Sequence, residues 1–267
     1  MAITTRDGHT AAVAAGQEVQ WGKTASRTAV ASTWFTVFDL AGNPGAGTLA
    51  GTSTTAGVVP TDATAGMPTI NAFSGSNSGY INAVDFGSTV ACRIRVYDLL
   101  WKGGAYAFNA NVTLSSQPSY SSRVPGGTDF AGLQIWIEAV TAFTGNQSIA
   151  VTYTNQAGTT GRSTGTIATG VAPIVGRMLQ LPLQAGDTGV QKIESVVSTV
   201  SSAGTFNVLV MKRLWSARIR VANDGDTHGP DKTSLMDVYA DSALYPIICP
   251  DSTATGIPEL QIAVING

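Results

Sequence analysis

The chain has 267 residues, and only 12% of its side chains are charged, which is about half of the usual share. Its 43% of apolar residues provide material for a hydrophobic core and exclude the composition of a disordered protein. The formal net charge of -2 gives no general attraction to phosphate backbones, so we expect no nucleic-acid partner.

Membrane and export signals are not expected either. Glycine, threonine, asparagine or a charged residue interrupts every apolar run before it could span a bilayer. No basic segment leads into an apolar stretch at the N-terminus, so we expect synthesis in the cytosol and no membrane partner. Cys92 and Cys249 lie far apart in apolar surroundings, which favours two buried free thiols over a disulfide.

The first predicted element is a short helix within residues 4–16, where a run of alanines ends at a glycine suited to a C-cap. Because an isolated helix of this length is marginal in water, we expect it to dock on a surface. Val19 and Trp21 follow with little local core to join. We therefore interpret residues 1–27 as an N-terminal arm for assembly, with a frayed terminus as the alternative, and residues 28–267 as a β-sandwich domain.

Beyond residue 28, runs rich in Val, Ile, Thr and aromatic residues indicate a series of strands separated by glycine-rich turns. Residues 93–97 and 133–138 alternate strictly, as in a half-buried antiparallel sheet. The predicted fold is mainly β, an antiparallel β-sandwich or jelly roll with a short N-terminal helix and long Gly/Thr/Ala-rich loops. The predicted strands are residues 29–40, 79–84, 89–99, 106–114, 133–140, 148–154, 178–183, 193–200, 206–211, 217–221, 244–249 and 260–265.

Residues 42–78 are predicted to form a long inserted loop of small side chains with Asp62 as its only charge. Small residues let one backbone approach another closely, so we expect an ordered segment packed on a surface rather than a flexible linker. The loop has few apolar residues to bury, which predicts that neighbouring subunits order it and not its own domain alone. These anchors are Leu49, Val58, Val59, Met67 and Ile70.

A second long connector, residues 222–238, contains the one stretch where acids and an imidazole converge. The spacing within residues 224–231 does not match an EF-hand loop, so a structural turn is favoured over an ion site. A triad of Asp226, His228 and Ser234 lacks the strained strand-to-helix turn that would present the serine.

Other chemical motifs are also missing from the sequence. The two histidines, His9 and His228, and the two cysteines embedded in apolar runs do not supply the three ligands of a catalytic metal site. The glycines form no phosphate-binding pattern. We therefore predict a protein that is not an enzyme and that uses no metal and no cofactor.

The strongest charge feature is the segment 212–220, KRLWSARIR. Arginine and tryptophan are enriched at interface hot spots, so this segment, with Arg93 and Arg95, is a candidate surface for an acidic neighbouring subunit. The alternative is that its charged residues are the solvated face of two strands. The candidate interaction residues are Trp21, Arg93, Arg95, Lys212, Arg213, Trp215, Arg218 and Arg220.

Several stretches along nearly the whole chain carry a family resemblance. They are residues 1–8 (MAITTRDG), 38–47 (FDLAGNPGAG), 58–66 (VVPTDATAG), 96–101 (VYDLLW), 151–156 (VTYTNQ), 187–193 (DTGVQKI) and 260–267 (LQIAVING). In the residues of these stretches and in their order along the chain, the protein resembles the head-decoration, or capsid cement, proteins of tailed bacteriophages. The resemblance implies a β-rich virion protein that binds the outside of the capsid shell and reinforces it against internal DNA pressure. It implies no catalytic residues.

On this basis the expected partners are the major capsid protein and copies of the chain itself, at the capsid surface of the virion. A composition poor in charge and rich in small residues suits close contacts between copies, and a trimer is one candidate oligomer. The chain lacks the long helical period of a major capsid protein. One alternative is a tail-tube, tail-fibre or baseplate protein. Another is a carbohydrate-binding β-sandwich whose aromatic side chains stack on sugars. The candidate residues are Trp34, Trp101, Trp136 and Tyr153, although aromatic residues spread over alternating strands are more often core residues.

Overall fold

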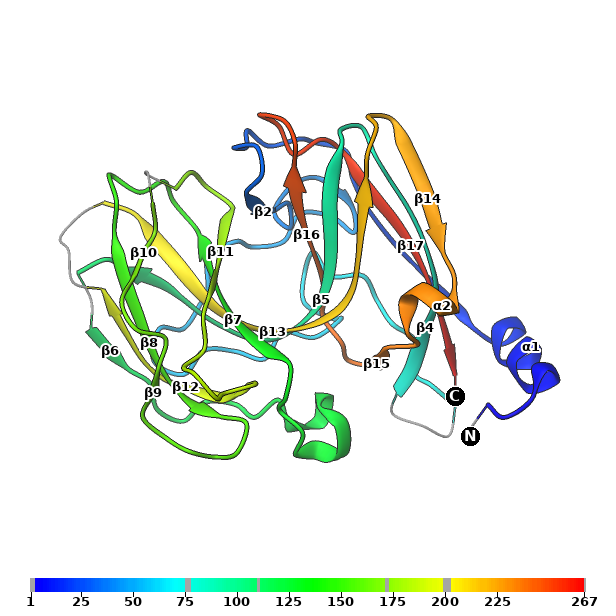
Figure 1. Ribbon diagram of the computed structural model, residues 1–267, viewed down its shortest axis with the longest axis horizontal. Coiled ribbons are helices and arrows are strands. Elements are labelled where there is room, and N and C mark those ends of the chain that lie inside the picture. Colours follow the sequence, from blue (N-terminus) through cyan, green and yellow to red (C-terminus); the bar gives the residue numbers. More distant parts are fainter. Residues whose placement is uncertain (1–2, 75–77, 110, 171–172, 199–202, 267) are drawn as a thin grey trace.

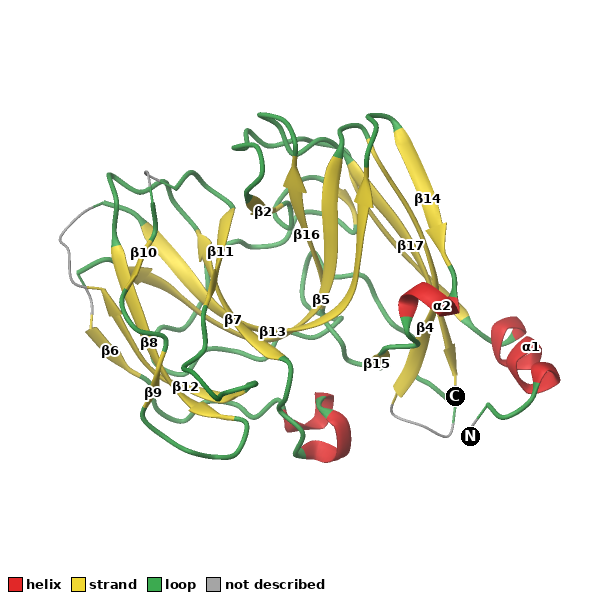
Figure 2. Ribbon diagram, in the orientation of Figure 1, coloured by secondary structure: helices red, strands yellow, loops and turns green. Residues whose placement is uncertain are grey.

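The computed structural model describes residues 3–74, 78–109, 111–170, 173–198 and 203–266. Its strands form two open sheets and one closed barrel (Figure 1). Helix is confined to short pieces (Figure 2), and every strand pairing among the described residues is antiparallel. The predicted fold class, mainly antiparallel β of the sandwich type, is confirmed.

The six-stranded barrel lies between the two open sheets (Figure 1). Its order around the barrel is β11-β2-β16-β5-β13-β7. The two long strands, β5 and β13, pair along most of their length, with shifts in register that mark bulges. The barrel strands are β2 (Trp34–Thr36), β5 (Cys92–Ala107), β7 (Leu133–Ala139), β11 (Arg177–Leu181), β13 (Thr205–Ile219) and β16 (Leu244–Pro250).

The two open sheets pack on different sides of the barrel. The first has the order β14-β4-β17-β1-β3, with β15 paired to β4; these strands are β1 (Gln17–Lys23), β3 (Gly42–Asn43), β4 (Ser78–Ser88), β14 (Asp224–His228), β15 (Asp237–Tyr239) and β17 (Pro258–Asn266). The second has the order β10-β8-β12-β6, with β9 paired to β8; these strands are β6 (Asn111–Thr113), β8 (Ser148–Asn155), β9 (Arg162–Ser163), β10 (Ile167–Ala168) and β12 (Val190–Ser198).

Three apolar clusters fill the layers, because alternate residues of a strand point to opposite faces. One joins the barrel to the first sheet and includes Ile94 and Val96 of β5. A second joins the barrel to the second sheet. The third, which includes Tyr97 and Leu99, fills the barrel. Strand β5 therefore contributes to all layers, which explains why it is buried over most of its length.

The helices are short. They are α1 (Arg6–Ala14), α2 (Pro230–Thr233) and the 3-10 turns η1 (Ser121–Arg123) and η2 (Pro125–Gly127). Thr5 caps α1 by accepting a hydrogen bond from the Gly8 amide at 3.0 Å, as the predicted helix requires. No described helix has the length and apolar character to cross a membrane. Cys92 and Cys249 are buried free thiols, as predicted.

The interpretation of residues 1–27 as a separate arm needs correction. Within it, β1 lies between β17 and β3 in the first sheet and pairs with β17 along six register positions from Gln17 to Gly22. Val19 and Trp21 are each only 2% exposed and belong to the core between sheet and barrel. Sequence alone missed this core because its other half comes from β4 and β17, far along the chain. The helix α1 has no buried residue, and it contacts the first sheet through His9 and Asn82.

The described part of the loop 42–78 has contacts within its own domain, and its predicted ordering by neighbouring subunits stays a prediction. The Val58 amide donates to the Lys102 carbonyl at 2.9 Å, and the Gly104 amide donates to the Ser53 carbonyl at 2.9 Å. Leu49, Met67 and Ile70 are buried. Backbone groups of the barrel therefore supply partners for this loop within its own chain.

Several strands in the structure have boundaries that differ from the predicted ones. Of the predicted strand 29–40, only Trp34–Thr36 is a strand. The run 206–211 and the first three residues of the run 217–221 belong to one continuous strand, β13, which ends at Ile219. The predicted turn within 224–231 is instead strand β14 and the beginning of α2. There, pairing of β14 with β4 satisfies the backbone of a polar segment that has no strand-like composition.

Candidate interaction surfaces

Four arginines gather at one end of the barrel, and we call them the arginine cluster: Arg93 and Arg95 on β5, and Arg213 and Arg218 on β13. Arg218 lies directly opposite Arg93 in the register, and Arg213 lies opposite Tyr97. Opposite residues of an antiparallel pair point to the same face. Because Tyr97 belongs to the barrel interior, the cluster lies at the mouth of the barrel.

Aromatic side chains hold the centre of the cluster in place. The Arg95 guanidinium lies over the Trp34 ring, 4.3 Å from its centroid. Arg95 also donates to the Tyr97 hydroxyl at 3.4 Å, and Tyr97 donates to the Gln134 side chain at 3.2 Å. Trp136 donates to the same Gln134 oxygen at 3.0 Å. This chain of contacts fixes the orientation of Arg95 while leaving its charge at the surface of the barrel mouth.

The charge of the cluster is largely uncompensated. Among the described residues its one ion pair joins Arg218 to Asp251 at 3.4 Å, with side chains 58% and 33% exposed. Such exposed pairs contribute little to stability, about 0–1 kcal/mol. Burial raises the pKa of Tyr97, while Arg95 and Arg213 oppose that shift, as expected where positive charge concentrates. The barrel mouth therefore has the chemistry to bind a carboxylate-rich surface.

The other residues of the predicted patch lie elsewhere. Trp215 is 3% exposed, contacts Phe86 edge-on and donates its indole N–H to His228 Nδ1 at 3.2 Å. Trp21 is buried in the same core, and Lys212 is 9% exposed. Arg220 is exposed just beyond β13. The structure thus brings together four of the arginines and places both tryptophans inside.

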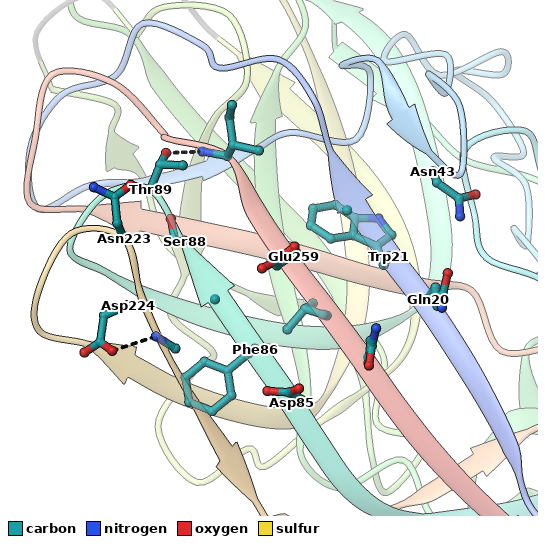
Figure 3. A pocket seen from close by; sticks show the side chains of 16 residues that line it. Gln20, Trp21, Asn43, Asp85, Phe86, Ser88, Thr89, Asn223, Asp224 and Glu259 are labelled. Carbon is teal, nitrogen blue, oxygen red and sulfur yellow. Dashed lines mark hydrogen bonds between the residues drawn. The ribbon is translucent and has the colours of Figure 1, made fainter.

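A second surface is a groove of about 630 Å³ on the first sheet (Figure 3). One cross-strand row runs through Gly22, Glu259, Gly87 and Gly225 on β1, β17, β4 and β14. Three glycines leave room on both sides of the single glutamate, which lies near the centre of the groove in Figure 3. A Cβ at Gly87 would lie 3.1 Å from the Glu259 carboxylate, so the lack of side chains shapes the groove.

The lining of this groove is acidic and rich in amides. The next cross-strand row holds Gln20, Gln261, Asp85 and Thr227, and the Thr227 hydroxyl donates to Asp85 at 3.3 Å. Polar side chains of this kind can accept hydrogen bonds from a cationic partner. The arginine cluster and the groove therefore offer opposite charges on one molecule.

The polar connector around His228 does not assemble the triad considered from the sequence. His228 Nδ1 faces the Trp215 indole, and its Nε2 lies 3.9 Å from Asp226. Burial and the nearby Lys232 lower the pKa of His228. Within the described parts of the chain, no three His, Cys, Asp or Glu side chains form a group that could hold a metal ion.

The aromatic residues considered as sugar platforms are mostly core residues. Trp101, Trp136 and Tyr153 have no exposed surface, and Trp34 is partly exposed beneath Arg95. Since stacking on a sugar needs an open ring face, this set of residues does not form a carbohydrate platform.

Comparisons with known proteins give no family for this chain. No protein-family model matches it, and no curated protein matches it. Among solved structures, the chain is similar to the T=1 particles derived from infectious bursal virus, with 7% identity over 94% of this chain and 77% of that chain and a TM-score of 0.17. The Gx strain of infectious bursal disease virus gives 8% identity over 94% and 81%, with a TM-score of 0.16. At these scores the likeness carries no argument about fold or function.

Proposed function

We propose that this protein is a non-enzymatic structural component of a virion that binds the outside of a bacteriophage capsid and stabilises the shell. The resemblance of its sequence to capsid cement proteins supports this proposal. The observation that carries it is the arginine cluster, in which four guanidinium groups share one end of the barrel and, among the described residues, one of them is paired with a carboxylate, that of Asp251. Such a surface suits a static electrostatic contact.

The partner of the cluster is an acidic patch on the major capsid protein. An exposed arginine–carboxylate pair contributes about 0–1 kcal/mol, so one site gives weak binding. Copies of the chain that contact one another on neighbouring sites bind more tightly than a single copy. Each bound copy raises the effective concentration of the next one at its site. The acidic groove around Asp85 and Glu259 gives such copies a surface that differs in charge from the barrel mouth.

Co-sedimentation tests this function directly. Purified protein is mixed with capsids prepared without it, and the pellet is assayed over a range of salt concentrations. We expect the protein to sediment with capsids and to dissociate as salt rises, because salt screens exposed charges. Sedimentation with isolated tails but not with capsids would favour the tail-protein alternative. Binding to neither would overturn the proposal.

A charge-reversal variant tests the surface. Replacing all four arginines of the cluster with glutamate should abolish binding, whereas Lys192→Glu, an exposed substitution on β12, should leave it unchanged. Circular dichroism would check that both variants remain folded. If the fourfold variant is folded and binds as well as the original protein, the contact lies elsewhere on the molecule.

A further inference from the structure

A buried group of three polar side chains lies at the other end of the barrel from the arginine cluster. Lys102 is on β5, Glu138 on β7 and Asn207 on β13, the strand between those two. Asn207 is directly opposite Glu138 in the register, and Lys102 is opposite Leu209, two residues further along β13. Glu138 and Asn207 are fully buried, and Lys102 is 6% exposed.

One oxygen of Glu138 contacts both nitrogens of this group. Its Oε2 accepts a hydrogen bond from Asn207 Nδ2 at 2.6 Å and lies 3.7 Å from Lys102 Nζ. A base that touches an amine and the nitrogen of an amide can carry a proton from the first to the second. The arrangement therefore contains a nucleophile, a base and an amide with a potential leaving group.

The loop 42–78 holds the amide of Asn207 in a fixed orientation. The Gly51 amide donates to Asn207 Oδ1 at 2.9 Å, and Asn207 Nδ2 donates to the Leu49 carbonyl at 2.7 Å. The Gly51 donor is placed where negative charge would develop if the side-chain carbonyl were attacked. Lys102 Nζ is held by the Thr48 carbonyl at 3.2 Å. One short segment thus positions both reacting groups.

The three side chains lie in buried surroundings. Glu138 Oε1 accepts a hydrogen bond from the Tyr245 hydroxyl, which also contacts Thr36 Oγ1 at 2.7 Å. Burial and the neighbouring Glu138 raise the pKa of Tyr245 well above its usual value, so this hydroxyl keeps its proton. Lys102 Nζ lies 5.4 Å from the centre of the Phe38 ring. An enclosed site of this kind strengthens electrostatic interactions and prevents competing hydrolysis.

We propose that Lys102 and Asn207 join in an intramolecular amide bond, with Glu138 as the catalytic residue. Glu138 takes a proton from the Lys102 ammonium, and the free amine attacks Asn207 Cγ. A new Nζ–Cγ bond forms, the Cγ–Nδ2 bond breaks, and the proton held by Glu138 passes to Nδ2, which leaves as ammonia. The second proton lost by Nζ remains on Glu138. Atoms and charge balance without an oxidant or any other reactant.

The reaction also removes two buried charges. A lysine and a glutamate in an enclosed site lose hydration, and an ion pair compensates for this only with good geometry. Here the two charged atoms are 3.7 Å apart, longer than an ordinary hydrogen bond. The products are a neutral amide and a neutral carboxylic acid, so the burial that opposes the ion pair favours the product.

Mass spectrometry of the intact, denatured protein tests the bond. We expect a mass lower than the sequence mass by one ammonia, and a protease digest that contains a branched peptide joining the segments around Lys102 and Asn207. Lys102→Arg and Glu138→Gln should each restore the sequence mass. Lys212→Arg changes another buried lysine of the barrel and should keep the deficit.

The result for the unsubstituted protein decides the proposal even where a variant fails to fold. A full sequence mass after prolonged incubation of the folded protein would overturn it. A deficit of one ammonia that maps to an unbranched peptide would also overturn it, because it would reflect cyclisation at another asparagine or glutamine. Retention of the branched peptide in Glu138→Gln would remove Glu138 from the catalytic role.

Discussion

The guanidinium of Arg95 lies over the indole of Trp34, 4.3 Å from the ring centroid. The ring attracts the cation and keeps the side chain from folding back onto the barrel, so charge is presented at the mouth with little freedom left to lose on binding. In the proposed function, this contact prepares the arginine cluster for its partner.

Trp34→Leu should therefore weaken capsid binding without unfolding the protein. A cation–π contact at an exposed site contributes about 0.5–1 kcal/mol, so we expect roughly a two- to fivefold loss of affinity. Co-sedimentation at fixed salt measures it. Equal affinity of the variant and the original protein would show that the indole does not prepare Arg95 for binding.

Arg123→Met should cause a large loss of stability. Arg123 is fully buried, forms an ion pair with Asp98 at 3.3 Å and donates to the Leu99 carbonyl at 2.9 Å. Removing one partner of a buried pair leaves the other charge uncompensated, which costs about 3–5 kcal/mol. Urea denaturation measures the loss. Adding Asp98→Asn to the variant should recover part of the stability, and no recovery would contradict this explanation.

Asp187 should make the second sheet sensitive to acid. Arg162, at 2.9 Å, lowers the pKa of Asp187 to about 2, with help from Asn155 and Tyr153. Because the folded pKa lies below the unfolded value of about 3.9, this contribution is full above that value and is lost as the pH falls towards 2. Unfolding midpoints between about pH 5 and 2 should fall less steeply in Asp187→Asn. Equal slopes would contradict the assignment.

The loop 42–78 should be protected in the free subunit. The amide of Gly51 donates to Asn207, and that of Val58 donates to the Lys102 carbonyl. Hydrogen exchange of these amides requires local opening of the barrel end. We expect slow exchange before any assembly, measured by mass spectrometry of the isolated protein. Fast exchange that slows only on capsids would show that neighbouring subunits order this loop.

Two deletions should distinguish the role of α1 from the role of β1. Removing residues 1–14 takes away a helix with no buried residue and the contact of His9 with Asn82 at 2.8 Å; the β fold should persist while association weakens. Removing residues 1–27 deletes β1 and the buried Trp21, so the first sheet should lose its packing. Circular dichroism and co-sedimentation distinguish the two. If the protein lacking residues 1–14 associates as well as the full chain, α1 has no role in association.

Local patterns in the sequence are enough to predict the class of fold and the faces of many strands. Alternation in 93–97 and 133–138 follows from the period of two residues in a strand, which is a local property. The same alternation separates Ile94, in the core beside the first sheet, from Arg95 at the barrel mouth. The apolar neighbours of Cys92 in the sequence likewise predict the buried thiol that the structure shows.

Which strand faces pack against each other depends on contacts between distant parts of the chain. Alternation assigns Trp21 and Trp215 to a face, but whether that face is covered depends on β4 and β17, which pair across long stretches of chain. The same holds for Lys102, Glu138 and Asn207, whose side chains meet because β13 lies between β5 and β7. Nothing local encodes that neighbourhood, since strand order is set by the packing of the whole barrel and by its closure.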